Sequence, residues 1–439
     1  MLEGFQNAGR IPELRRRVFF TLAMLAVYRV VVAIPTPGID GRALAELFEQ
    51  MRNSVLGMVN LLSGGALEQF SIAALGVMPY ISASIILQLM TVVIPHLERL
   101  SKEGEAGRRK ITQYTRYGTV VLAVIQGLFI SMGLEQAQSP GGAPIVYEPG
   151  WSFRVMTIMT LAAGTAFLMW IGEQISERGI GNGISMIIFA GIVASLPSAV
   201  LTTFQFVREG EMSIFMLLFL AAFMIAIVAV IIFVERGQRR IPVQYAKRVV
   251  GRRMYGGQSS HLPLKVNTAG VIPPIFASSL LVFPATIAQF VDHPWAQAAS
   301  GMLSQGGFVY DAVFVGLVIF FAYFYTAVTF NTSDVAENMK KFGGFIPGIR
   351  PGQRTAEYID RVLTRITLVG AIYIAAVCVL PTILIQQLNV PFYFGGTALL
   401  IVVGVALDTV SQLETHMLTR SYQGFMRRGR LRGRTSRAS

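Results

Sequence analysis

Ten apolar stretches, each long enough to cross a bilayer, alternate with polar loops along this chain of 439 residues. A transmembrane helix needs about 20 mostly apolar residues to cross a hydrocarbon core about 30 Å thick. The pattern predicts an all-α polytopic membrane protein with ten transmembrane helices and both termini on one side. The predicted spans are Val18 to Ile34, Leu75 to Pro95, Tyr117 to Leu134, Val155 to Ile171, Ile184 to Leu201, Ser213 to Val234, Ala269 to Phe290, Ala312 to Phe330, Ile366 to Ile385 and Phe394 to Leu413.

The spans divide into two sets of five at the outer loop Thr202 to Met212. Because each half holds an odd number of spans, the second half enters the membrane from the opposite side, and any structural repeat is an inverted one. The two halves show no convincing sequence similarity, so this repeat is inferred from topology alone. The predicted organisation is an N-terminal half over residues 1–201, a connecting loop over 202–212, a C-terminal half over 213–413 and a basic tail over 414–439.

The outer loop from Pro35 to Ala74 breaks the simple alternation of span and loop. Within it, Leu56 to Leu62 is apolar, Gly64 and Gly65 interrupt, and an apolar run resumes at Phe70. Such a segment is too short to span, and non-helical backbone at membrane depth is tolerated only inside protein or beside a water-filled cavity. The pattern predicts a re-entrant element, with an amphipathic helix on the outer surface as the alternative.

Two long loops on the side of the termini also stand out. Residues 235–268 carry RGQRR, KR and RR with apolar residues interleaved, which predicts a β-hairpin projecting from the membrane. Residues 331–365 carry KKFGGFIPGIRPG, where Gly and Pro predict a turn that presents Arg350. Long loops of this kind are usually functional.

Basic residues are distributed unequally across the membrane. Of the 37 Lys and Arg residues, 32 fall on the side of the termini and 4 on the other side, while Arg29 lies inside the first span. An excess of basic residues marks cytoplasmic loops, which places both termini in the cytoplasm. Acidic residues number 13 and 10 on these sides, so the +13 total contains net charges of +19 and −6. The basic loops either orient the chain and contact anionic lipid or bind a large partner with an acidic or phosphate-bearing surface.

The sequence lacks the motifs of enzymatic chemistry. It contains no phosphate-binding P-loop, no HExxH pair and no GxSxG elbow. The run GIGNG at 179–183 follows a predicted membrane helix instead of a strand, and we interpret it as a tight turn between helices. The single cysteine, Cys378, excludes an internal disulfide and a multi-thiolate metal site. We therefore predict no enzymatic activity, no metal and no cofactor.

Polar groups within the spans are few. Arg29 and Asp408 are the only charged residues there, fewer than a proton-coupled transporter usually shows. Gln126, near the middle of the third span, either forms packing hydrogen bonds or lines a polar path. A secondary transporter would share the five-plus-five plan, so this class remains an alternative, and a membrane-embedded enzyme or scaffold is a weaker one.

Isoleucine pairs recur four residues apart in two spans. Ile81 and Ile85 share one helix face, and Ile188 and Ile192 share another. Apolar pairs of this kind face lipid or core in every membrane protein, so their spacing alone does not indicate a pore.

Eight motifs, in order and covering nearly the whole chain, resemble those of the SecY family, whose members form the channel of the protein-conducting translocon. The motifs are IPTPGID at 34–40, NLLSGGALEQFSIAALGVMPYISASII at 60–86, SKEGEAGRRKITQYTRYG at 101–118, ERGIGNGIS at 177–185, VERGQRRIPVQYAKR at 234–248, LPLKVNTAGVIP at 262–273, FIPGIRPG at 345–352 and PFYFGGTALLIVV at 391–403.

The resemblance implies a clam-shell of two inverted five-helix halves around an hourglass pore, with the loop 202–212 as an external hinge. It implies a lateral gate between the second and third spans and the seventh and eighth, with Gln126 as a polar gate residue. Arg252, Arg253 and Arg350 correspond to loops where the ribosome or the SecA motor docks. The implied pore ring is Ile81, Ile85, Ile188, Ile192, Ile275 and Ile401. The implied plug is Asn60, Leu61, Leu62, Ser63, Gly64, Gly65, Ala66, Leu67, Glu68, Gln69 and Phe70.

The function that the resemblance implies is the passage of unfolded secretory polypeptides across the bacterial cytoplasmic membrane, with release of hydrophobic segments sideways into lipid. The implied partners are the small membrane subunits SecE and SecG, the SecA ATPase, the ribosome, signal peptides and the transported chains. Anionic lipid is a further expected partner.

Overall fold

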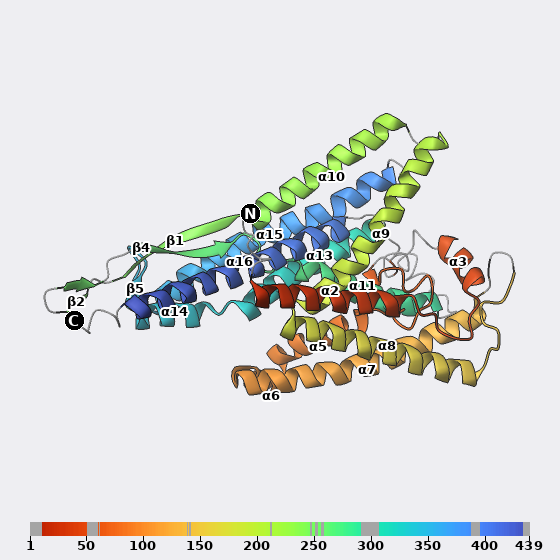
Figure 1. The fold of residues 1–439 in the computed structure, drawn as a ribbon, viewed down its shortest axis with the longest axis horizontal. Coiled ribbons are helices and arrows are strands. Elements are labelled where there is room, and N and C mark those ends of the chain that lie inside the picture. Colours follow the sequence, from red (N-terminus) through yellow and green to blue (C-terminus); the bar gives the residue numbers. More distant parts are fainter. Residues whose placement is uncertain are drawn as a thin grey trace. The chain divides into compact units, whose positions relative to one another are not determined.

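The computed structural model describes residues 11–50, 60, 62–137, 139, 142–210, 213–245, 248–250, 253–255, 259–290, 307–387 and 396–432. Each of the ten predicted spans coincides with a helix in Figure 1, which confirms the helical class. These helices are α2 (Pro12–Val32), α5 (Met78–Val93), α7 (Glu105–Gln136), α8 (Trp151–Arg178), α9 (Gly183–Arg208), α10 (Ile214–Glu235), α11 (Ile272–Phe290), α13 (Phe308–Thr329), α15 (Gln353–Gln387) and α16 (Gly396–Arg432).

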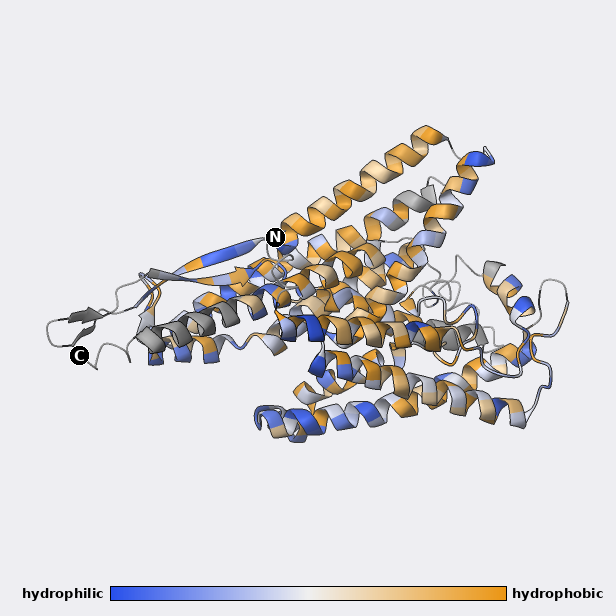
Figure 2. Cartoon of the chain, in the orientation of Figure 1, coloured by the Kyte–Doolittle hydropathy of each residue, from blue (hydrophilic) through white to orange (hydrophobic). Residues whose placement is uncertain are grey.

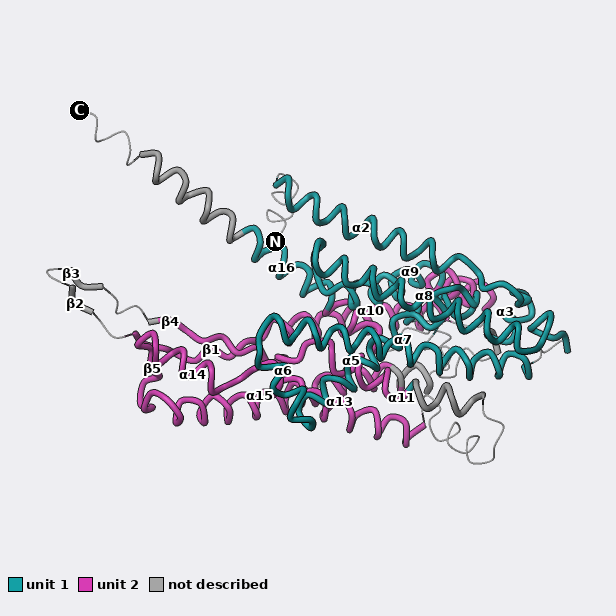
Figure 3. Tube along the Cα trace, turned by 90° about the horizontal axis from the view of Figure 1, so that it is seen from below, with its two compact units in different colours: residues 1–198, 282–301, 405–439 teal, residues 199–281, 302–404 magenta. Residues whose placement is uncertain are grey.

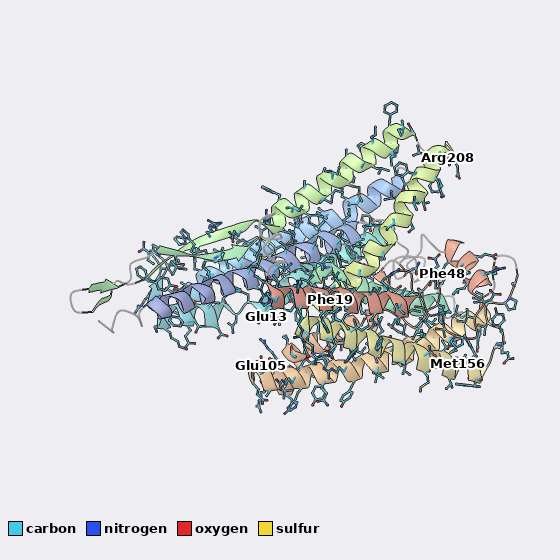
Figure 4. The ribbon with its side chains drawn as sticks, viewed as in Figure 1. Glu13, Phe19, Phe48, Glu105, Met156 and Arg208 are labelled. Atoms are coloured by element: carbon cyan, nitrogen blue, oxygen red, sulfur yellow. The ribbon has the colours of Figure 1, made fainter. Side chains whose placement is uncertain are left out.

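Within the described residues, seven helices are long and apolar enough to cross a membrane. An eighth span arises if α5 and the short helix α6 (Pro95–Lys102) count as one element bent by 100°. Hydropathic colouring shows how apolar these helices are, α10 almost throughout (Figure 2). Large apolar side chains also remain exposed, as Phe19 on α2 does with 73% of its surface (Figure 4). Such exposure suits helices that face lipid.

The helix ends follow local chemistry. Proline occupies the first turn of α2, α5 and α6, where its missing N–H costs no helical hydrogen bond. The hydroxyl of Ser213 caps α10 by accepting from the backbone N–H of Phe215. Asn331 caps α14 (Thr332–Lys341) by accepting from the N–H groups of Ser333 and Asp334. These caps place the boundaries between apolar spans and polar loops.

The chain divides into two compact units (Figure 3). Unit 1 comprises residues 1–198, 282–301 and 405–439, and unit 2 comprises 199–281 and 302–404. The boundary after residue 198 lies near the one expected after residue 201, while α11 and α16 each contribute to both units. The functional halves and the hinge stay predictions.

Within unit 1, α7 packs along α5 and α8, and α2 packs along α8. Small residues allow these close approaches, as where Gly127 of α7 faces the backbone of Ile158 in α8. The guanidinium of Arg116 on α7 donates to Glu173 on α8 at 2.8 Å. The short helix α3 (Gly41–Gln50) belongs to the outer loop of this unit.

Within unit 2, α15 packs along α13 and α14, and a three-stranded sheet joins the two long loops. Strand β1 (Gln238–Tyr245) pairs antiparallel with β4 (Ser259–Lys265), so that Ile241 lies opposite Leu262. Strand β5 (Gly344–Phe345) adds to the other edge of β1. The short strands β2 (Arg248–Val250) and β3 (Arg253–Tyr255) form a separate pair at the tip. The predicted hairpin is confirmed.

Candidate functional site

The segment expected to act as a plug has helical residues at Asn60 and Leu62, followed by turns and a bend over residues 63–70. Apart from Leu61, which lies outside the described residues, most of its members are buried, including Ala66 at 0% and Phe70 at 1% exposure. Asn60 organises the segment: its amide donates to Glu68 at 3.0 Å, and its carbonyl oxygens accept from the N–H groups of Gly65 and Glu68. These buried turns favour the re-entrant interpretation over a helix resting on the surface.

The C-terminal end of this segment is tied to other parts of unit 1. The N–H of Thr36 donates to the carbonyl of Phe70 at 2.8 Å, and the N–H of Ile72 donates to Ile34 at 3.0 Å. Phe70 has φ 41°, an unfavourable value for a bulky residue. A Cβ on Gly164 of α8 would lie 1.9 Å from the carbonyl oxygen of Ile72, so helix and loop touch backbone to backbone. These contacts hold the end of the segment against α8 and against the loop that follows α2.

Sequence reasoning missed two contacts to the middle of the segment. Tyr28 and Arg29 of α2 donate hydrogen bonds to the carbonyls of Ser63 and Gly64. A separation of 35 residues leaves no periodic signal for such bonds. The one available hint was the presence of a charged residue inside an apolar span.

The six isoleucines of the predicted ring are all buried. In unit 1, Ile81 and Ile85 lie on α5, while Ile188 and Ile192 lie on α9, none more than 3% exposed. Ile81 and Ile85 share a buried face of α5, whereas the next residue, Ile86, is 42% exposed and lies on another face. In unit 2, the ring candidates Ile275 on α11 and Ile401 on α16 are 6% and 0% exposed. A ring drawn from both units stays a prediction.

Gln126, the predicted gate residue, lies on the inner face of α7. It is 8% exposed and follows the buried residues Thr119 and Ala123 on the same helical stripe. The structure therefore places an amide within a packed face of unit 1. Its role at a gate stays a prediction.

The predicted docking residues lie on the two loops that the sheet joins. Arg350 is exposed in the turn that follows Ile346. Ile346 is 3% exposed and packs with Ile241, Leu264 and Ile359. The hydroxyl of Thr355 donates to the carbonyl of Arg350 at 3.0 Å and closes the turn. The apolar cluster thus anchors the turn, and the Arg350 side chain is exposed; its role in docking stays a prediction.

Arg253 begins β3, where it pairs with Val250, whereas Arg252 lies outside the described residues. Further basic side chains, those of Arg239, Arg240 and Lys265, are exposed on β1 and β4. The sheet therefore presents basic side chains, and the apolar cluster that includes Ile241 and Leu264 packs against it.

A polar joint connects this sheet to α11, the helix that carries Ile275. The buried amide of Asn267 donates to Glu235 at the end of α10 at 2.6 Å and to the carbonyl of Gly270 at 2.9 Å. A Cβ on Gly370 of α15 would lie 2.7 Å from the carbonyl oxygen of Val266, so this helix also abuts the joint. The sheet and the start of α11 are thus coupled through close contacts within unit 2.

The run GIGNG forms the expected turn between α8 and α9. Gly181 has φ +88°, and a Cβ on Gly183 would lie 1.8 Å from the carbonyl oxygen of Gly172. The backbone N–H of Ile180 donates to the hydroxyl of Thr21 on α2 at 3.1 Å. The glycines therefore serve helix packing. Across the described residues, no group of three His, Cys, Asp or Glu side chains could hold a metal ion.

Comparisons with known proteins agree with this arrangement. The SecY family model matches residues 71–410. The chain is 52% identical over 434 residues to a protein translocase subunit SecY from Escherichia coli strain K12, covering 98% of each chain. A solved SecY structure that concerns the plug domain and the closed translocation channel superposes with a TM-score of 0.65 at 17% identity, covering 92% of this chain and 93% of that one. The Sec61 chain of a canine ribosome-channel complex superposes with a TM-score of 0.61 at 15% identity, with the same coverage.

Proposed function

Because this chain belongs to the SecY family, we propose that it is the central subunit of a protein-conducting channel in a membrane. The observation that carries this conclusion is 52% identity to a SecY translocase subunit across 98% of both chains. The ten helices at the predicted spans agree with it.

The channel gives an unfolded polypeptide an aqueous path. In hydrocarbon, each unpaired backbone N–H and C=O group costs several kcal/mol, so a bare chain does not cross lipid. The branched side chains of the six-isoleucine ring yield around a chain of any sequence and offer it no hydrogen bonds. A dry apolar constriction also impedes ions by dewetting. Burial of all six residues supports this role.

The segment 60–70 closes the resting channel as a plug. Its buried turns and its hydrogen bonds to the rest of unit 1 support this role. A lateral gate that includes Gln126 opens toward lipid and releases apolar segments of the transported chain. An amide within an otherwise apolar stretch of α7 suits a helix that meets both protein and water.

The basic sheet and the turn at Arg350 dock the partners that drive transport. The related Sec61 chain was solved in a complex with the ribosome, and the exposed charges on the two joined loops support docking of the ribosome or of the SecA ATPase here. SecE and SecG complete the membrane complex. The charge distribution supports a location in the bacterial cytoplasmic membrane with both termini cytoplasmic.

Reconstitution tests the proposal. The purified chain, combined with SecE and SecG in vesicles and supplied with SecA and ATP, should move an unfolded secretory protein into a protease-protected lumen. Vesicles that lack the chain are the control. Failure to protect the secretory protein, in vesicles where the complex is folded, would contradict the function.

A further inference from the structure

Arg29 is a charge inside an apolar helix, and the structure shows what it binds. An ionisable residue within a membrane span is costly and is normally paired. In the described part of the chain, no Asp or Glu forms an ion pair with Arg29. Its Nη1 instead donates to the carbonyl of Gly64 at 2.9 Å, in the middle of the plug. The acceptor of this charged donor is the backbone of the plug itself.

The neighbouring residue of α2 makes a second bond of the same kind. Tyr28 is 1% exposed, and its hydroxyl donates to the carbonyl of Ser63 at 2.9 Å. Two adjacent side chains of α2 thus donate hydrogen bonds to two adjacent carbonyls of the plug. Recognition of carbonyl groups does not depend on the side chains that the plug carries.

A glycine contact holds these carbonyls within reach. Gly64 has φ +72°, and a Cβ at this position would lie 2.8 Å from the Cα of Gly191 and 2.8 Å from the Tyr28 oxygen. Gly191 lies on α9 between the ring residues Ile188 and Ile192. The plug is therefore hydrogen-bonded to α2 and lies in direct contact with α9, the helix that carries two ring residues.

We propose that Tyr28 and Arg29 are positioning residues that latch the plug in the closed channel through its backbone. This inference rests on the proposed function of residues 60–70 as the plug. Displacement of the plug breaks both bonds, and so the latch favours the resting state until a translocating chain competes. Hydrogen bonds to charged groups are stronger than those between neutral groups, and the Arg29 bond contributes more.

Resting ion conductance in planar bilayers tests the latch, using the chain in its complex with SecE and SecG. Arg29→Gln should raise conductance many-fold, and Tyr28→Phe, which removes a single oxygen atom and keeps the ring packed, should raise it several-fold. Arg29→Lys, which keeps a charged donor, should restore most of the closed state. Arg116→Gln is the matched control, because that arginine binds Glu173 of α8.

Deletion of residues 60–70 separates the latch from the plug assignment. If the deletion raises conductance and Arg29→Gln adds nothing further in that background, the arginine acts through the plug. If the deletion raises conductance while both Arg29→Gln and Tyr28→Phe match the parent, the latch is wrong and the plug stands. If Arg29→Gln raises conductance as much without the plug as with it, the latch is also wrong. If the deletion leaves conductance unchanged, the plug function itself fails.

Discussion

The segment 60–70 of unit 1 and the β4-β1-β5 sheet of unit 2 both lie outside the long helices, and they are held in different ways. Besides burying apolar side chains such as Phe70, the segment accepts two hydrogen bonds from α2 on its backbone and meets α9 through a glycine contact. The sheet has continuous strand pairing and an apolar cluster of Ile241, Leu264, Ile346 and Ile359 beneath it.

This difference matches the work proposed for each region. Directed polar bonds can break one at a time and be replaced by bonds to water, so the contacts between the segment and α2 can be released and formed again. A packed apolar cluster loses many contacts at once when it opens, so an element held this way resists movement. The plug has to move during transport, whereas a docking surface has to withstand the load of its partner.

The largest expected effect comes from the exposed charge of Arg350, in the turn next to the sheet. Arg350→Glu should abolish motor-driven export, because it reverses the charge that the partner meets. The free energy of unfolding should change by no more than about 0.5 kcal/mol, as is usual for a surface substitution. Export into vesicles and the midpoint of thermal unfolding measure the two effects. Normal export by this variant would count decisively against the docking role.

Removal of the segment 60–70 should have the next largest effect. A chain that lacks residues 60–70 should fold and insert, because this segment contributes no spanning helix, and should leak ions at rest. Conductance of planar bilayers measures the leak. A deleted chain that conducts no more than the parent would show that the ring seals unaided or that the segment is no plug.

Shortening a side chain of the apolar cluster tests whether this cluster stabilises the sheet. Ile359 is fully buried, and Ile359→Ala should destabilise the sheet by about 2–5 kcal/mol. Hydrogen exchange of the β1 and β4 amides should rise accordingly. Arg361→Ala, at an exposed position on the same helix, is the control. Equal exchange in both variants would mean that the cluster does not support the sheet.

The smallest expected effect lies within the segment. Asn60→Ala removes two side-chain bonds to Glu68. The bond to its carboxylate contributes about 1.5–3 kcal/mol, and the bond from its backbone N–H contributes about 0.5–1.5 kcal/mol. Resting conductance should rise modestly, and less than after deletion of the whole segment. Gln69→Ala, at an exposed position, should leave conductance at the level of the parent. Equal resting conductance of the two variants would show that the Asn60 side chain does not help to hold the channel closed.

Local sequence patterns predicted many of the elements of this molecule, whereas contacts between residues far apart in the chain could not be predicted. The spans follow from runs of apolar residues, and the re-entrant segment follows from Gly64 and Gly65 within a run too short to span. The addition of β5 to the sheet pairs Gln244 with Phe345, and no local pattern encodes a pairing across that distance. Arg29 was identifiable as unusual, yet its acceptor is a carbonyl, which every residue possesses.

The roles of the site residues came from the family resemblance, because their chemistry is ordinary. A buried isoleucine in a pore ring and one in a packed core have the same composition and the same helical spacing. Burial of Ile81 beside an exposed Ile86 distinguishes the two faces of α5. It does not distinguish a face that meets a passing chain from one that meets another helix.

The most direct test of the central claim is crosslinking of a stalled translocation intermediate to the ring. Single cysteines replace each of the six ring isoleucines in a Cys378→Ser background, and a cysteine is placed in the middle of the transported chain. We expect disulfide crosslinks from cysteines at positions Ile81, Ile85, Ile188, Ile192, Ile275 and Ile401, and none from control cysteines at exposed positions such as Ile86 and Val200. Crosslinks that favour the control positions would show that the polypeptide does not pass through this ring.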